Sequence, residues 1–227
     1  MSLNIQIPQE RSFISVKSNE GEELRKVIRE NDFKDCLEIG LAFGQSACYM
    51  LDAGPKVSLT SLDPFQTDHY QDQALKNIEA NGFGDRHSHI PMFSDRGLPY
   101  LLDQGRSFEF IFIDGDHKFD GAFVDFHFAA QLLRKGGILV FHDMWMRSLV
   151  LVAEFIRKNR PDFEEIQLEG GNMVGFRKIK EDQRDGMVFN EFYSTKGFLR
   201  YHINRMSYER KTFLGKAIFS LKKMLKR

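Results

Sequence analysis

The chain has 227 residues, of which 42% are apolar and 28% are charged, and its formal net charge is zero. This length supports one α/β domain with a full hydrophobic core and is short for two, while the composition excludes a disordered chain and a coiled coil. No run approaches the roughly 20 apolar residues that cross a bilayer, and the first residues are polar where a signal peptide has its apolar centre. We therefore expect a cytoplasmic protein.

Apolar runs of strand length alternate with helical patterns along most of the chain, as in parallel strands that are buried on both faces. The predicted strands are 36–39, 57–62, 108–113, 138–141, 163–168 and 173–179, and the predicted helices are 18–31, 46–51, 69–80, 95–102, 119–133 and 148–158. This order predicts an α/β fold with a doubly wound sheet. Gly170, Gly171 and Asn172 predict a hairpin between the last two strands, so the last strand is expected to be antiparallel.

Two glycines follow the first predicted strand, at the edge where open parallel sheets bind ligands. Gly40 and Gly44 have G-x-x-x-G spacing, which differs from the G-x-G-x-x-G of dinucleotide sites, and no P-loop lysine follows them. Glu38 would repel a phosphate but suits a positively charged ligand. Asp63, which ends the next strand, can accept both hydroxyls of a ribose. Together these residues predict a nucleoside ligand with a cationic, phosphate-free tail; the alternative is that they serve only the turns.

Four segments, in order, resemble the motifs of class I S-adenosylmethionine (SAM)-dependent methyltransferases. They are residues 37–46 (LEIGLAFGQS), 62–65 (LDPF), 112–117 (FIDGDH) and 136–143 (GGILVFHD). Within that superfamily they resemble the group known as methyltransferase domain 24, relatives of the catechol-type O-methyltransferases. The resemblance implies a Rossmann-like seven-stranded sheet with its last strand antiparallel and helices on both faces. It places the methyltransferase domain in residues 1–180 and leaves residues 181–227 as a basic, helical extension.

The resemblance also implies a site for SAM as cofactor. Carried over by position, Gly40 and Gly44 border the methionine part of SAM, and Asp63 holds the ribose. The family often has an acid near the adenine amino group after the third strand. Residues 92–94 (Met-Phe-Ser) stand there in this chain, so Phe93 is expected to pack on the base. The expected cofactor residues are Glu38, Gly40, Gly44, Ser46, Asp63, Phe65, Phe93, Ser94 and Asp114.

Five titratable side chains follow the fourth and fifth predicted strands, which are neighbours in this fold: Asp114, Asp116, His117, His142 and Asp143. In the catechol-type relatives the matching positions bind magnesium, so the resemblance implies a divalent metal, Mg or Mn, on Asp114, His142 and Asp143. A histidine in this set favours manganese, iron or zinc over magnesium. In the metal-free alternative, His117 is the catalytic base, with a pKa near neutrality, and Asp114 and Asp143 lie beside it. A third interpretation is that His142 and Asp143 only cap the fifth strand and that His117 hydrogen-bonds Asp114.

The predicted function is transfer of a methyl group from SAM to the hydroxyl of a small molecule, with Trp145 as a candidate to line the acceptor pocket. Methylation of a nucleic-acid base is disfavoured, because residues 114–117 lack the Asn/Asp-Pro-Pro-aromatic turn of those enzymes. A non-catalytic cofactor-binding or scaffold protein on the same fold is the other alternative. The glycine spacing disfavours a dehydrogenase.

Charge is distributed unevenly along the chain. Residues 196–227 contain ten Lys and Arg against one acid, Glu209, which gives +9 to this tail and −9 to residues 1–195. An acidic body disfavours nucleic acid as a partner. Residues 208–227 have the pattern of a basic amphipathic helix. We expect this helix to dock on its own domain or across a homodimer, because the body is acidic; an anionic membrane surface is the alternative.

Overall fold

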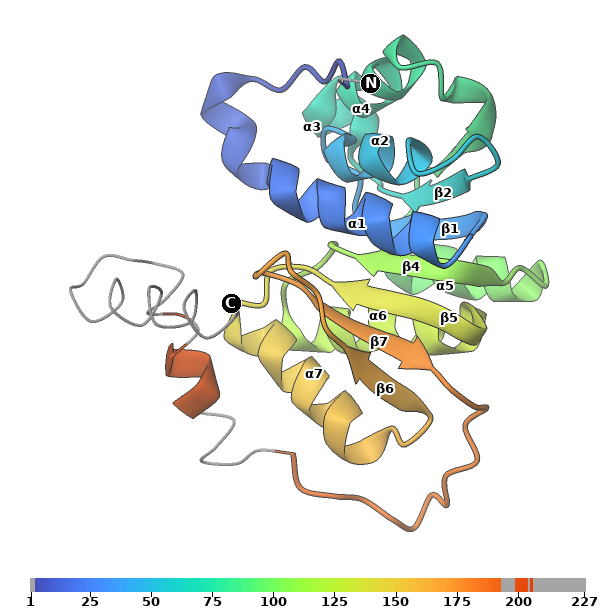
Figure 1. Ribbon diagram of the computed structural model, residues 1–227, viewed down its shortest axis with the longest axis vertical. Helices are drawn as coiled ribbons and strands as arrows, with labels where there is room; N and C mark the ends of the chain where they lie inside the picture. Colours follow the sequence, from blue (N-terminus) through green and yellow to red (C-terminus); the bar gives the residue numbers. More distant parts are fainter. Residues whose placement is uncertain (1–2, 193–198, 204, 206–227) are drawn as a thin grey trace.

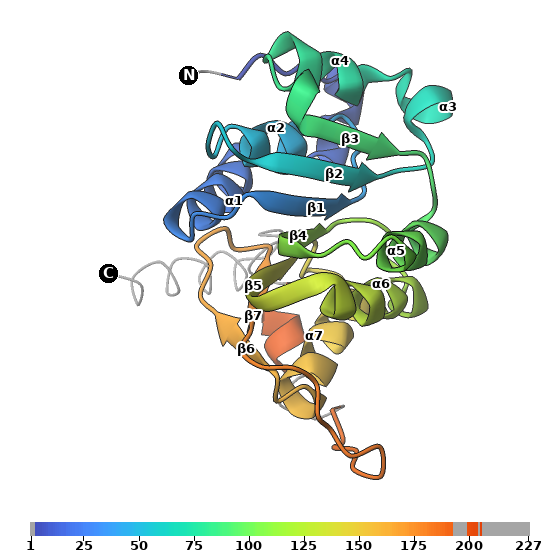
Figure 2. The same cartoon turned by 90° about the vertical axis from the view of Figure 1, so that its right-hand side faces the viewer.

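A computed structural model describes residues 3–192, 199–203 and 205 of the protein. Its strands are β1 Asp35–Ile39, β2 Ser58–Leu62, β3 His87–Ile90, β4 Phe108–Ile113, β5 Leu133–Phe141, β6 Phe163–Ile166 and β7 Val174–Lys178. They form one seven-stranded sheet in the order β3-β2-β1-β4-β5-β7-β6, which Figure 2 shows from β3 at the top to β6 at the bottom. β1 to β5 pair in parallel, and β7 is antiparallel to β5 and β6. The predicted α/β, doubly wound, Rossmann-like sheet is confirmed.

Helices cover both faces of the sheet (Figure 1). They are α1 Ser18–Glu30, α2 Gln45–Leu51, α3 Gln66–Tyr70, α4 Gln73–Ala80, α5 Ser94–Asp103, α6 Phe119–Leu132 and α7 Arg147–Asn159, with 3-10 turns at Gln9–Ile14 and Gly84–Arg86. One hydrophobic core joins the sheet to α5, α6 and α7, and a second joins it to α1, α2 and α4. Leu37 and Ile39 face the first core and Cys36 the second. Because both faces of β1 are buried, its sequence is mostly apolar, with Glu38 as a buried exception.

Three elements differ from the prediction. The helix predicted over 69–80 is two helices, because Gln71 and Asp72 between α3 and α4 have left-handed φ values of 52° and 57°. β3 is not predicted as a strand, because its sequence His-Ser-His-Ile lies at the sheet edge and contains no apolar run. β5 begins earlier than predicted, because Leu133 pairs with Phe108 of β4.

The segment before α1 lies against the helices of the second core. The backbone of Asn4 and Gln6 is hydrogen-bonded to the side chains of Asn81 and Asn77 of α4. Farther along, the guanidinium of Arg11 lies 4.9 Å from the ring centres of Phe43 and Tyr70. This path brings residues 13–16 to the edge where the parallel strands end.

Beyond β7, residues 181–192 contain no helix or strand, and Asn190 is hydrogen-bonded to Asn159 at the end of α7. The domain boundary at residue 180 stays a prediction, as do the homodimer and the docking of the tail. The amphipathic helix predicted over 208–227 lies outside the described residues. In the part of the chain that is described, no helix has the length and apolar character needed to cross a membrane.

Candidate active site

A cavity of about 1040 Å³ lies at the carboxyl ends of β1, β2, β4 and β5. The strand order reverses between β1 and β4, and ligands of open α/β sheets bind at such a point. The predicted site residues that line the cavity are Gly40, Ser46, Asp63, Phe65, Phe93, Ser94, Asp114, His117, Asp143 and Trp145. Glu38, Gly44 and His142 are not among the lining residues.

The loop after β1 requires glycine at both predicted positions. Gly40 has φ +88°, and a Cβ there would lie 2.2 Å from the carbonyl oxygen of Asp114. Gly44 has φ +73° at the start of α2, and its Cβ would lie 3.0 Å from the Cβ of Ala74. A side chain at either position would be strained by its backbone and crowded by a neighbour. The glycine loop therefore lies directly against the loop that follows β4.

Asp63 is buried at the end of β2 and holds the glycine loop in place. Its Oδ2 accepts the backbone amides of Leu41 and Ala42 at 3.0 and 2.9 Å and the side-chain amide of Gln66 at 3.2 Å. Its Oδ1 accepts the backbone amide of Phe65 at 2.7 Å. Each carboxylate oxygen has two lone pairs, so Oδ1, which accepts one hydrogen bond, keeps a position for a ligand hydroxyl. The residue predicted to hold a ribose thus also fixes the loop beside it.

Glu38 is fully buried behind the glycine loop. Its carboxyl accepts hydrogen bonds from the hydroxyl of Ser46 and, at 2.9 Å, from that of Ser61, which also lies 3.0 Å from Nε2 of His87. Burial raises the pKa of Glu38 to about 8, although the two serine hydroxyls act against it. Glu38 is therefore mainly neutral at pH 7 and reaches the cavity only through Ser46. The sequence predicts that Glu38 attracts a cationic ligand directly. In the structure, Glu38 does not line the cavity and is mainly neutral, so it does not supply this attraction.

Two aromatic side chains, which follow β2 and β3 in the sequence, line another part of the cavity. Phe65 and Phe93 meet edge to face with ring centres 5.4 Å apart, and Phe65 also stacks on His69 at 4.7 Å. Both phenylalanines line the cavity and are partly exposed, by 38% and 53%. Exposed ring faces of this kind offer a surface for a flat base. Ser94, the first residue of α5, lines the cavity next to them.

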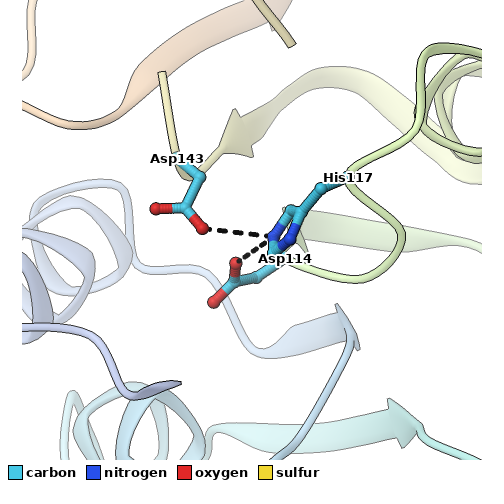
Figure 3. Close-up of side chains that lie close together, drawn as sticks. All are labelled: Asp114, His117 and Asp143. Atoms are coloured by element: carbon cyan, nitrogen blue, oxygen red, sulfur yellow. Dashed lines mark ion pairs between the residues drawn. The ribbon is translucent and has the colours of Figure 1, made fainter. Parts of the chain in front are cut away.

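Asp114, His117 and Asp143, which follow β4 and β5, line the cavity and meet one another (Figure 3). Nε2 of His117 lies 3.1 Å from Oδ2 of Asp143 and 3.7 Å from Oδ1 of Asp114. These contacts with Asp114 and Asp143 raise the pKa of His117 to about 9, so His117 is protonated at neutral pH. This differs from the near-neutral pKa that the sequence predicts. Among the described residues, these three side chains form the group whose ligand atoms lie within 4.8 Å of one another, as metal binding requires.

His142 lies behind this cluster and not in it. Its Nδ1 is 3.2 Å from Oδ1 of Asp114 and 3.5 Å from Oδ1 of Asp143, and its Nε2 is 3.2 Å from Oε2 of Glu20. Burial alone would lower the pKa of His142, but Asp114 and Glu20 raise it to about 10. With an acid at each ring nitrogen, His142 is a buried cation. The geometry therefore places His117, instead of the predicted His142, in the metal-binding set with Asp114 and Asp143.

Two residues that the sequence analysis misses complete the cluster. Glu20 comes from α1, and Asn172, from the turn between β6 and β7, donates through Nδ2 to Oδ1 of Asp143 at 3.1 Å. Glu20 lies among other glutamates in the sequence, and Asn172 fits an ordinary hairpin turn. Only their burial, with 2% and 5% of their surfaces exposed, marks them as partnered polar groups. Trp145 lines the cavity as expected, and its Nε1 donates to Oδ1 of Asp143 at 2.9 Å.

Comparison with known sequences supports the motif assignment. Residues 37–144 match the family described as a methyltransferase domain. A curated relative, the uncharacterized protein R132 of Acanthamoeba polyphaga mimivirus, is 30% identical over 117 residues, which are 50% of this chain and 53% of that protein. The chain thus spans about half the length of the curated relative that it matches.

Solved structures share the fold at low sequence identity. The O-methyltransferase of Bacillus cereus in complex with S-adenosylhomocysteine (SAH) matches with a TM-score of 0.62 and 19% identity over 71% of this chain and 80% of that chain. The O-methyltransferase TomG of Streptomyces achromogenes, involved in tomaymycin synthesis and in complex with SAM, gives 0.62 and 18% over 77% and 90%. The SAH-bound methyltransferase PaMTH1 of Podospora anserina gives 0.64 and 16% over 73% and 80%. The family match supports the predicted methyltransferase class, and these structures confirm the fold.

Proposed function

Because residues 37–144 form a methyltransferase domain on the class I fold, we propose that this chain transfers the methyl group of SAM to a hydroxyl of a small molecule. The observation that carries the proposal is a single cavity lined by two unlike groups of residues, which we call its cofactor end and its acceptor end. One end holds the glycine loop and Asp63, and the other holds Asp114, His117 and Asp143. The first end suits a nucleoside without phosphates, and the second can take up a proton or hold a metal.

The cofactor end fits SAM by its chemistry. The glycine loop lines the cavity through Gly40, Leu41 and Ala42, and the two glycines let it pack closely against the loop after β4 and against α4. Asp63 keeps an acceptor position for a hydroxyl, and Phe65 and Phe93 present ring faces to a base. SAM supplies, when bound, a methyl group on a positively charged sulfur that is already activated for transfer.

The chain's own residues must then align the acceptor hydroxyl, exclude water and take up its proton. Alignment alone contributes about 7 to 11 kcal/mol in well-oriented reactions, and a general base contributes about 10²- to 10⁴-fold. His117 lines the cavity and is the side chain that can take the proton. Its pKa is raised by Asp114 and Asp143, so neutralising these acids lowers it again. A positive charge that engages both acids would therefore leave more His117 unprotonated, and so available as a base, at neutral pH.

The same three side chains also fit a divalent metal, Mg or Mn. Two carboxylates with one imidazole favour manganese over magnesium, which prefers oxygen ligands. A bound metal would supply a Lewis acid that makes the acceptor hydroxyl easier to deprotonate. His117 would then be a ligand and not the base, so the two versions of the site can be separated by experiment.

Calorimetric titration with SAM, SAH, NAD and ATP tests the cofactor, and we expect only the first two to bind. Transfer of a labelled methyl group to a panel of phenols, catechols and aliphatic alcohols then tests the reaction. If EDTA treatment and metal add-back leave turnover unchanged, the metal version is wrong and His117 is the base. Binding of SAM without transfer to any acceptor would favour the non-catalytic alternative, and failure to bind SAM and SAH would overturn the proposed function.

A further inference from the structure

Asp125, in the middle of α6, has a fully buried carboxylate. None of its surface is exposed, and neither of its carboxylate oxygens has a hydrogen-bond partner among the described residues. Burying such a group is costly, and native proteins rarely leave one unsatisfied without a functional reason.

Two neighbours place Asp125 directly behind the wall of the cavity. A Cβ built on Gly115 would lie 3.5 Å from Oδ2 of Asp125. The hydroxyl of Ser94 acts on the same carboxyl: burial raises the pKa of Asp125 to about 6, and Ser94 opposes this shift. Gly115 and Ser94 both line the cavity, and Asp125 does not. Figure 2 shows the two helices that carry Ser94 and Asp125, α5 and α6, side by side. Asp125 therefore reaches the cavity through Ser94.

The charged groups near Asp125 are acids, so its carboxylate needs a hydrogen-bond donor. The charged groups that act on it, Asp116 and Asp95, are both acids and disfavour its ionised form. At pH 7 the carboxylate is still mainly ionised, so it can only accept hydrogen bonds. The hydroxyl of Ser94 is the donor beside this carboxylate. When it donates its hydrogen to Asp125, its oxygen lone pairs remain available as acceptors. This makes Ser94 an acceptor in the cavity wall, next to Phe93.

The adenine of SAM carries a donor that matches this acceptor, its 6-amino group. Residues 92–94 contain no acid for it, and Phe93 and Ser94 line the part of the cavity where the base is expected. We propose that Asp125 is a positioning residue for adenine recognition, which orients the Ser94 hydroxyl to accept a hydrogen bond from the 6-amino group. The proposal rests on the proposed function, because it requires an adenosine cofactor in this cavity.

Calorimetry on the full chain with two ligands tests this proposal. SAH carries the 6-amino group, and S-inosylhomocysteine carries a carbonyl oxygen in its place. We expect the wild-type protein to prefer SAH by about tenfold or more, since a site that is built to pair with an N–H rejects an analogue that lacks it. Asp125→Asn and Ser94→Ala should each reduce this preference to about threefold or less. Asp120→Asn, which changes an exposed acid of the same helix, should keep the full preference.

Equal weakening of both ligands in the two variants, with the preference for SAH intact, would overturn the proposal and leave Asp125 a structural role. If Asp125→Asn does not fold, Ser94→Ala decides alone, and an unchanged preference in that variant overturns the proposal. A wild-type protein that binds neither ligand would instead overturn the proposed function. A wild-type protein that prefers SAH, together with variants that keep this preference, would contradict the roles of Ser94 and Asp125 but not the proposed function.

Discussion

The two ends of the cavity are built by different means. The cofactor end is formed mainly by backbone, with two glycines and with the amides of Leu41 and Ala42, which donate to Asp63. At the acceptor end, charged side chains bind one another, and the pKa values of His117 and His142 shift as a result. The cofactor end is thus part of the fold, while the acceptor end is an ion-pair network attached to it. Changes at the first should affect binding and stability together, and changes at the second should affect turnover and pH response.

The largest effect is expected from His117→Ala. Loss of the base should slow methyl transfer by about 10²- to 10⁴-fold. The affinity for SAH should stay the same, because Asp114 and Asp143, the partners of His117, belong to the acceptor end. Single-turnover rates and calorimetry measure the two quantities, and His127→Ala, which changes an exposed histidine of α6, is the control. Full activity in His117→Ala would remove it as the base.

Gly40→Ala should damage binding and stability at once. Its Cβ would lie 2.2 Å from the backbone of Asp114 at a φ of +88°, so we expect a loss of about 3 kcal/mol in the free energy of unfolding and no measurable SAH binding. Gly82→Ala is the matched control, because Gly82 has φ +73° but no neighbour within 4 Å of a Cβ. It should cost about 1 kcal/mol. Denaturant titration would contradict the steric argument if both variants lost the same stability.

The pKa of His142 predicts how stability depends on pH. Its value of about 10 lies above the ordinary 6.5, so protonated His142 stabilises the fold fully below pH 6.5, and this contribution is lost as the pH rises through 10. The free energy of unfolding should fall by on the order of 2 kcal/mol between pH 7 and 10. Glu38, with its pKa near 8, acts in the same direction, so His142→Gln is needed to isolate the histidine. A variant with the same pH slope as the wild type would contradict this role.

Asp63→Ala should weaken SAM and SAH by about tenfold or more, because a hydrogen bond to a charged group contributes roughly 1.5 to 3 kcal/mol. The fold should lose stability as well, since the amides of Leu41 and Ala42 lose their acceptor. Asp68→Ala, which removes an exposed acid from α3, should change neither quantity. Unchanged calorimetric affinity in Asp63→Ala would remove Asp63 from the cofactor site.

Asn172→Ala is expected to have the smallest effect. It removes one hydrogen bond to Asp143, which is worth about 1 kcal/mol, so turnover should fall about fivefold while SAH affinity stays the same. Steady-state kinetics with saturating SAM measures the change. Reduced stability with unchanged turnover would show that Asn172 supports the hairpin and not the cluster.

These ends also differ in how well the sequence predicts them. β1, β2, β4 and β5 are predictable because strands buried on both faces are mostly apolar, and the residues at their carboxyl ends meet by topology alone. β3 cannot be predicted in this way, because it is an edge strand with histidines at alternate positions and has no apolar run. At the acceptor end, the pKa of His117 depends on its distances to Asp114 and Asp143, which no motif encodes. The role of Glu20 cannot be predicted either, because only the folded chain brings it to His142.

The contact between Glu20 and His142 joins residues that are 122 positions apart, and Asn172 adds a partner 30 positions later. Contacts between distant parts of a chain form slowly, because a long loop must close first. During synthesis, α1 emerges early but must wait for β5 and for the turn after β6 before its glutamate meets the histidine. The glycine loop and Asp63, only about twenty residues apart, can come together much sooner. The acceptor cluster is therefore completed late in the folding of the domain, and a chain truncated before Asn172 would lack it.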